Sequence, residues 1–288
     1  MKILVVGGTR YFGIPMVNAL LAKGHDVTIA TRGNAKVEFE GRVSYAVLDR
    51  MDSSSVKRAL ENQKFDVIID KIAYGSNDVK ALLENVSCDR YIQMSTCSVY
   101  PNEHANISED EFVTSEYLLE WMDRLPDYEK TKRNAERAVL EYMDSSACTF
   151  VRYPVVLGEN DYTGRLRFYL EHIKEENPMF VDDLDHAMSF IHEKEAGEFI
   201  AYLVDHPLSG AVNGCSNGAI KISEIISYAE EKLGKKAVLD ENGEAAPYNG
   251  LTDSLTFNTE KAKKAGYVFS DLNSWIYKLI DYEIGNIR

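Results

Sequence analysis

The sequence lacks the features that mark membrane-spanning, disulfide-bonded and zinc-binding proteins. No run of 18 uncharged apolar residues occurs in its 288 positions, so we expect no membrane partner. The N-terminal stretch has one lysine and a short apolar run that ends in glycines, which is not typical of a signal peptide. The histidines show no HExxH spacing, and we expect no metal site. The four cysteines show no CxxC spacing and are expected to be reduced thiols of a cytoplasmic protein: Cys88, Cys97, Cys148 and Cys215.

Positive charge is also scarce. The chain has 32 lysines and arginines against 46 aspartates and glutamates, a net charge of −14. Seven carboxylates lie between Glu103 and Asp123 without a lysine or arginine, which is typical of a solvated surface. Phosphate backbones repel a protein this acidic, so we expect no nucleic-acid partner. An anionic small substrate would need locally placed arginines.

Short apolar runs alternate with helical segments in the first half, and this pattern predicts βαβ units around a parallel sheet. The runs ILVV and VII are continuous rather than alternating, as in strands that are buried on both faces. We therefore expect an α/β fold with a doubly wound parallel sheet. The expected strands are 2–6, 27–30, 43–47, 67–70, 91–94 and 148–153, and the expected helices of this half are 12–23, 54–62, 78–85 and 128–143.

The pattern loosens after Pro154, where Gly, Asn and Asp gather near positions 158–164. Helices are predicted at 166–175, 193–205, 223–233 and 274–284. We expect a dinucleotide-binding domain over residues 1–154 and a smaller substrate-binding domain over 155–288, partly interleaved with the first.

A glycine-rich turn follows the first strand directly and opens a helix. Gly7 allows the tight turn, Gly13 permits close packing of helix on sheet, and the helix N-terminus offers free amides to phosphates. This context predicts the dinucleotide-binding (Rossmann) arrangement. The expected cofactor contacts of the turn are Gly7, Thr9, Arg10, Tyr11, Phe12 and Gly13.

The second strand ends in Arg32, where NAD-preferring enzymes usually carry an acid. Two guanidiniums, Arg32 and Arg10, suit a 2′-phosphate and favour NADP over NAD. The alternative is that Arg32 points to solvent.

Tyr128 and Lys132 are four residues apart, so both fall on one face of a helix. A neighbouring ammonium lowers the pKa of a phenol and makes it a better base. The same spacing is common in surface helices. Residues 95–100, STCSVY, place hydroxyls at the carboxyl end of a predicted strand, where open α/β sheets bind ligands.

Taken in order, the glycine turn, STCSVY, YEKTK and Arg152-Tyr153-Pro154 leading to Gly158 resemble the extended short-chain dehydrogenase/reductase superfamily. The resemblance is strongest to its NAD-dependent epimerase/dehydratase branch. Within that branch, Arg10 in place of the middle glycine is similar to a subgroup with a GGTRF-type turn, which includes epimerases and plant plastid RNA-binding relatives.

The resemblance implies a role for several residues. Thr96 and Tyr128 match the catalytic hydroxyl and the acid/base, and Lys132 matches the lysine that holds the ribose. The other implied cofactor contacts are Asp49 with Arg50 near the adenine, Ile72 and Ala73 after the fourth strand, and Pro154 and Val155 beside the nicotinamide.

These features predict an enzyme that transfers a hydride between NAD(P) and a sugar or nucleotide-sugar hydroxyl, as an epimerase or a reductase. Arg165 is the candidate for an anionic substrate group. Dehydratase chemistry is not expected, because Cys97 and Ser98 stand where the dehydratases carry two acids. The alternative is a non-catalytic dinucleotide-binding regulator or RNA-associated protein on the same fold. A homodimer could form through an apolar stripe of Ala135, Ala138, Val139 and Tyr142.

Overall fold

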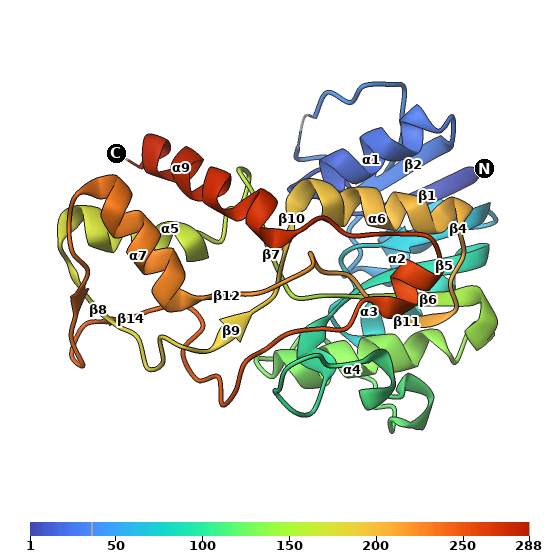
Figure 1. The fold of residues 1–288 in the computed structure, drawn as a ribbon. Coiled ribbons are helices and arrows are strands. Elements are labelled where there is room, and N and C mark those ends of the chain that lie inside the picture. Colours follow the sequence, from blue (N-terminus) through green and yellow to red (C-terminus); the bar gives the residue numbers. More distant parts are fainter. Residues whose placement is uncertain (36, 288) are drawn as a thin grey trace.

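A seven-stranded parallel sheet forms the larger part of the molecule (Figure 1). The computed structural model describes residues 1–35 and 37–287. The strand order is β11-β6-β5-β4-β1-β2-β3, so the order reverses between β1 and β4. The strands are β1 (Lys2–Val6), β2 (Asp26–Thr31), β3 (Ser44–Val47), β4 (Lys64–Asp70), β5 (Ser87–Thr96), β6 (Cys148–Tyr153) and β11 (Gly210–Asn213). The doubly wound parallel sheet expected from the sequence is confirmed.

Helices cover both faces of this sheet, which explains the continuous apolar strands. Ile3 and Val5 of β1 pack towards α1 (Gly13–Ala22) and α6 (Glu193–Asp205). Leu4 and Val6 of the same strand join the opposite cluster. That cluster includes α2 (Ser53–Leu60), α3 (Ser76–Leu83) and α4 (Tyr128–Val139). With neither face exposed to water, every position of the strand can be apolar.

A smaller lobe lies beside the carboxyl edge of the sheet, on the left in Figure 1. Its helices pack around a separate apolar cluster that includes Tyr169, Ile225 and Leu279. The helices are α5 (Arg165–Glu175), α7 (Ile222–Leu233) and α9 (Ile276–Asn286), while the short α8 (Glu260–Lys264) packs on β11. The short strands are β7 (Val155–Leu157), β8 (Pro178–Phe180), β9 (Ala187–Met188), β10 (Phe190–His192), β12 (Ile220–Lys221), β13 (Val238–Leu239) and β14 (Glu244–Ala245).

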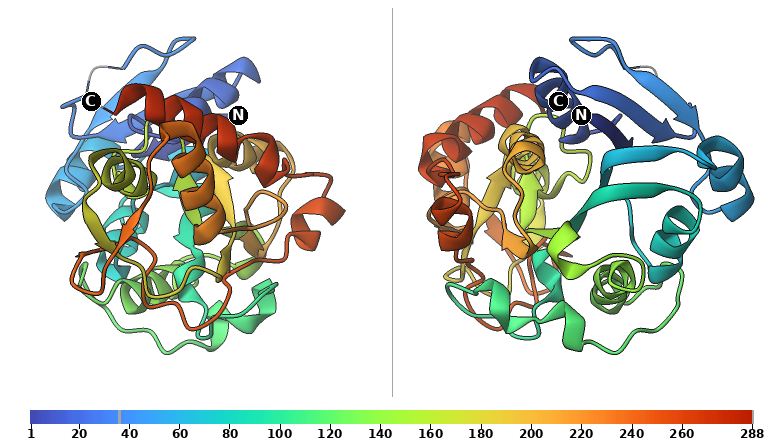
Figure 2. Two further views of the ribbon diagram at one scale, coloured as in Figure 1. Left: turned by 60° about the vertical axis from the view of Figure 1, so that its left-hand side comes forward. Right: turned by 90° about the vertical axis from the view of Figure 1, so that its right-hand side faces the viewer.

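The second half of the chain is interleaved with the first. Helix α6 packs on α1, and β11 pairs with β6 to extend the large sheet. A Cβ at Gly197 of α6 would lie 2.6 Å from the carbonyl oxygen of Phe12, so glycine allows the two helices to touch (Figure 2). Residues 193–213 therefore complete the sheet that the first 154 residues begin.

The apolar stripe of α4 packs inside the chain. Ala135, Ala138 and Val139 are fully buried with α3 and the sheet, and Tyr142 donates to Glu84. The homodimer remains a prediction, and this stripe does not support it. Among the described residues, no helix is long and apolar enough to cross a membrane.

Candidate active site

A cavity of about 1010 Å³ lies at the carboxyl edge of the large sheet, between the sheet and the smaller lobe. The glycine turn, the ends of β4 and β5, the start of α4 and the segment from β6 to α5 line it. Open α/β sheets bind their ligands at this edge, where the strand order reverses. Most of the cofactor and substrate residues expected from the sequence line this one cavity, but Gly13, Ala73 and Lys132 do not.

The glycine turn approaches its neighbours as closely as its backbone allows. Gly7 has φ 83°, and a Cβ there would lie 2.8 Å from Cγ2 of Ile72. A Cβ at Gly13 would lie 2.9 Å from the carbonyl oxygen of Gly8. Side chains at these two positions would displace the turn from the helix N-terminus, where a phosphate binds. Gly13 itself packs behind the cavity wall.

Tyr11 links the turn to the segment after β6. Its backbone is left-handed, with φ 54°, and its hydroxyl donates to the carbonyl oxygen of Val156 at 2.7 Å. The rings of Tyr11 and Tyr162 pack in a T-shaped arrangement at a centroid distance of 5.9 Å. The turn and the first strand of the smaller lobe are thus joined directly.

The residues expected at the adenine end of the cofactor differ in whether their charge is paired within the protein. Arg32 and Asp49 line the cavity, and the Asp49 carboxylate accepts the backbone N–H of Met51. Arg50 also lines the cavity, but its guanidinium forms a buried pair with Asp70, with contacts of 2.6 and 3.0 Å. The charge of Arg50 is therefore paired with Asp70 and is not free to bind a ligand.

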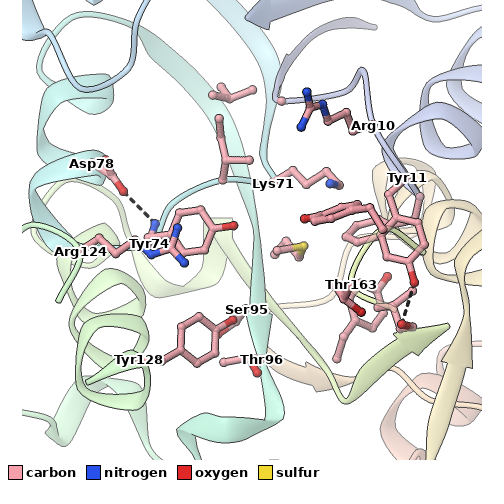
Figure 3. Close-up of a pocket in the computed structure, with 18 of the residues that line it drawn as sticks. Arg10, Tyr11, Lys71, Tyr74, Asp78, Ser95, Thr96, Arg124, Tyr128 and Thr163 are labelled. Carbon is pink, nitrogen blue, oxygen red and sulfur yellow. Dashed lines mark hydrogen bonds between the residues drawn. The ribbon is translucent and has the colours of Figure 1, made fainter. Parts of the chain in front are cut away.

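Tyr128 and Thr96 lie side by side at the end of β5, as Figure 3 shows. Tyr128 is the first residue of α4, and the N-cap Asp127 accepts the backbone N–H of Lys130. As a residue Tyr128 is 37% exposed, yet its phenol is crowded enough that burial raises its pKa. The neighbouring Thr96 hydroxyl and the guanidiniums of Arg124 and Arg165 oppose that rise. The phenol is therefore protonated at neutral pH.

Lys132 does not line the cavity. It is fully buried, and its ammonium donates to the carbonyl oxygens of Ala73 at 2.8 Å and Met94 at 2.9 Å. Burial lowers its pKa to about 8. The spacing of four places Lys132 on the same face of α4 as Tyr128, but this second turn packs against the sheet. Lys132 therefore holds the loop after β4 and the end of β5 in place through these two carbonyl oxygens. Ala73, a second expected cofactor contact, also does not line the cavity.

Five cations line the cavity without an ion-pair partner among residues 1–35 and 37–287: Arg10, Arg32, Lys71, Arg124 and Arg165. Arg124 lies over the ring of Tyr74 at 4.3 Å, and Lys71 lies over the ring of Phe12 at 4.1 Å. In a chain of net charge −14, this concentration of free positive charge favours an anionic ligand.

Sequence reasoning missed two of these cations and most of the wall near the smaller lobe. Lys71 directly follows a predicted strand, so its position at the carboxyl edge was the available signal. Arg124 ends the acidic stretch and has no local signature. The other missed lining residues include Tyr74, Tyr162, Thr163, Met188, Ser189, Leu255 and Phe257. They come from segments far apart in the sequence.

A second buried ion pair supports the wall that carries Thr96. Arg152 of β6 and Glu136 of α4 are both fully buried, and their closest contact is 2.8 Å. Ser95 and Thr114 donate to the same carboxylate, and Arg152 also donates to the backbone oxygens of Glu109 and Phe112. The pair fixes the acidic segment against the sheet.

Comparison with known proteins identifies the family. The profile of the NAD dependent epimerase/dehydratase family matches residues 3–85 and 70–217. A curated relative, the chloroplast stem-loop binding protein of 41 kDa b from Arabidopsis thaliana, is 31% identical over 113 residues. That match spans 34% of this chain and only 30% of the relative.

Several solved structures share the fold. UDP-glucose 4-epimerase from Thermotoga maritima, with UDP-glucose, superposes with a TM-score of 0.76 at 16% identity and covers 100% of both chains. UDP-glucuronic acid 4-epimerase from Bacillus cereus, with UDP-glucuronic acid and NAD, gives 0.73 at 19% identity, also with 100% of both chains covered. With a doubly wound sheet, a glycine turn and a family profile that spans most of its length, this chain belongs to the NAD dependent epimerase/dehydratase family.

Proposed function

We propose that this protein interconverts a hydroxyl and a ketone on a sugar or nucleotide sugar, with NAD(P) as the redox partner. The observation that carries the proposal is the placement of Tyr128 beside Thr96 in the cavity that also contains the glycine turn (Figure 3). Acid/base chemistry and dinucleotide binding are thereby brought to one site. The family and the bound ligands of its structural relatives support this choice of substrate class.

Tyr128 and Thr96 would transfer the hydroxyl proton and position the reacting oxygen. A dinucleotide held by the glycine turn would supply the redox chemistry, that is, hydride transfer from and to the carbon that carries the hydroxyl. Tyr128 takes up the hydroxyl proton as the ketone forms and donates it back as the alcohol is restored, while Thr96 hydrogen-bonds the same oxygen. Since burial raises the pKa of Tyr128, the protonated phenol is ready for the reductive direction. Arg124 and Arg165 would favour the phenolate that oxidation requires.

Arg32 is the basis of a finer proposal, a preference for NADP. Its guanidinium lines the cavity at the end of β2 and has no carboxylate partner among the described residues. A 2′-phosphate would supply one. Dehydratase activity is not proposed, because the side chains after Thr96 are a buried thiol and a hydroxyl.

Tyr128→Phe tests the acid/base role. We expect turnover to fall by about 10²- to 10⁴-fold, because proton transfer is lost, while the affinity for the dinucleotide stays nearly unchanged. Mass spectrometry of the purified protein would first identify the dinucleotide and sugar that co-purify. NMR would then follow turnover of that sugar, and calorimetry would measure cofactor binding.

Tyr282→Phe is the matched control, since Tyr282 is an exposed tyrosine on α9 outside the cavity. Wild-type turnover in Tyr128→Phe would refute the assignment. Loss of turnover in both variants would also refute it.

A second candidate is RNA binding, which the plant relative makes worth testing. The cavity cations could contact phosphates, but the net charge of −14 opposes binding to a nucleic-acid backbone. A gel-shift assay with a stem-loop RNA distinguishes the two. Tight binding that Arg10 or Arg124 substitutions abolish would favour RNA over a sugar.

A further inference from the structure

Lys71 is a cavity cation that the proposed chemistry does not use. It follows Asp70 at the carboxyl end of β4, and its backbone N–H donates to the carbonyl oxygen of Val6 at 3.1 Å. The residue therefore sits where the strand order reverses, between β1 and β4. Its side chain lines the cavity.

The ammonium lies beside the start of α1. Its distance to the ring centroid of Phe12 is 4.1 Å, and Phe12 is the N-cap residue of that helix. Figure 3 shows the Lys71 side chain extending towards Arg10 and Tyr11 of the glycine turn. The cation is thus close to the free amides with which a helix N-terminus binds phosphate.

The carboxylates nearest to Lys71 in the sequence are already engaged. Asp70 accepts from Arg50, Tyr91 and the backbone of Ile72. Asp78 accepts from the backbones of Tyr74 and Gly75 and pairs with Arg50.

Among the described residues the Lys71 ammonium makes no hydrogen bond or ion pair, and its partial removal from water lowers its pKa to about 8. The side chain is half-buried, and a cation held partly out of water without a counterion is costly; such groups cluster at binding sites.

We propose that Lys71 binds the pyrophosphate of the dinucleotide from β4, opposite the amides of the glycine turn. In doubly wound folds the pyrophosphate lies at the helix N-terminus, beside the point where the strand order reverses. Lys71 lies at that point, at the end of β4 and next to the start of α1. Arg124 and Arg165 act on the phenol of Tyr128 instead, so they belong to the reacting end of the cavity. The inference rests on dinucleotide binding but not on the identity of the sugar.

Calorimetric titration with ADP, adenosine and NAD tests this contact. We expect Lys71→Met to weaken ADP and NAD by about ten- to a hundredfold, since a charge-assisted phosphate contact is lost. Adenosine, which has no phosphate, should bind equally to the variant and the wild type. Lys71→Arg should retain most of the ADP affinity, because it keeps the charge.

Lys80→Met is the matched control, because Lys80 is an exposed lysine on the next helix, against Trp121 and outside the cavity. It should leave all three affinities unchanged. Unchanged ADP affinity in Lys71→Met, or an equal loss for adenosine, would overturn the inference. If Lys71→Met does not fold, Lys71→Gln provides the neutral comparison. Wild-type protein that binds neither ADP nor NAD would refute the proposed function itself.

Discussion

Two sets of cations lie within the same part of the molecule and have opposite surroundings. Arg50, which lines the cavity, and Arg152, which lies outside its lining, are both buried against carboxylates, with closest contacts of 2.6 and 2.8 Å. On the cavity wall, Arg10, Lys71 and Arg165 face open space without a carboxylate among the described residues. The sequence alone does not distinguish the sets. Pairing with a carboxylate therefore distinguishes the cations that stabilise the fold from the cations available to a ligand.

Removal of a carboxylate beneath the cavity should have the largest effect on stability. Glu136→Leu leaves the Arg152 charge buried and unpaired, and we expect a loss of about 3–5 kcal/mol in the free energy of unfolding. Urea denaturation followed by circular dichroism measures it. Glu141→Gln on the same stretch removes an exposed partner of Arg137 and should cost less than about 1 kcal/mol. Equal losses would show that the buried Arg152–Glu136 pair contributes no more to stability than the exposed Arg137–Glu141 pair.

Acidification should lower the stability of the protein through the same Glu136–Arg152 pair. Burial alone would raise the pKa of Glu136, but Arg152 and the hydrogen bonds from Ser95 and Thr114 outweigh it and hold that pKa below its usual range. A depressed carboxyl pKa contributes stability at neutral pH that is lost as the pH falls through the folded-state value. The wild type should therefore lose more stability on acidification below about pH 4.5 than Glu136→Leu does.

Reversal of a charge on the cavity wall should change ligand choice rather than stability. Wild type should bind NADP more tightly than NAD, and Arg32→Asp should remove about ten- to a hundredfold of that preference. Titration of both dinucleotides measures the ratio. Arg42→Asp makes the same charge change on the exposed connection between β2 and β3 and should leave it intact. Tighter NAD binding by the wild type would show that Arg32 does not meet the 2′-phosphate.

Arg165 should give the smallest of these effects. It begins α5 and faces the cavity, so Arg165→Met should raise KM for an anionic sugar substrate by roughly tenfold or less. NAD affinity should not change. Arg58→Met on α2 replaces an exposed arginine outside the cavity and serves as the control. A change in NAD affinity without a change in KM would indicate that Arg165 contacts the cofactor rather than the substrate.

The sequence predicted the large sheet well, because its signals are local. Apolar runs between helical segments mark β1, β2, β4 and β6. In the first turn, Gly7 is required for its positive φ and Gly13 for the close approach of the backbone of Gly8. The helix bounds agree to within a few residues, apart from the shorter α4. Strand β11 was missed, since Gly210–Asn213 is a short run without a pattern and pairs with β6 only in the folded chain.

The site was harder to predict than the sheet, because depth and pairing are not local properties. A spacing of four gives the face of α4 that carries Lys132 but not how closely that turn packs on the sheet. Arg10 and Arg50 are equally basic in the sequence, and only the fold brings Asp70 to Arg50. The wall near the smaller lobe combines Met188, Leu255 and Phe257, and no spacing links them.

The hydrogen bond from Tyr11 to Val156 has a thermodynamic consequence. One end belongs to the turn that meets the cofactor, and the other belongs to β7, which pairs with β10 of the smaller lobe. A ligand that strengthened or weakened this bond would act on both places at once. The resulting coupling free energy is reciprocal, so the factor by which a dinucleotide changes sugar affinity equals the factor by which the sugar changes dinucleotide affinity.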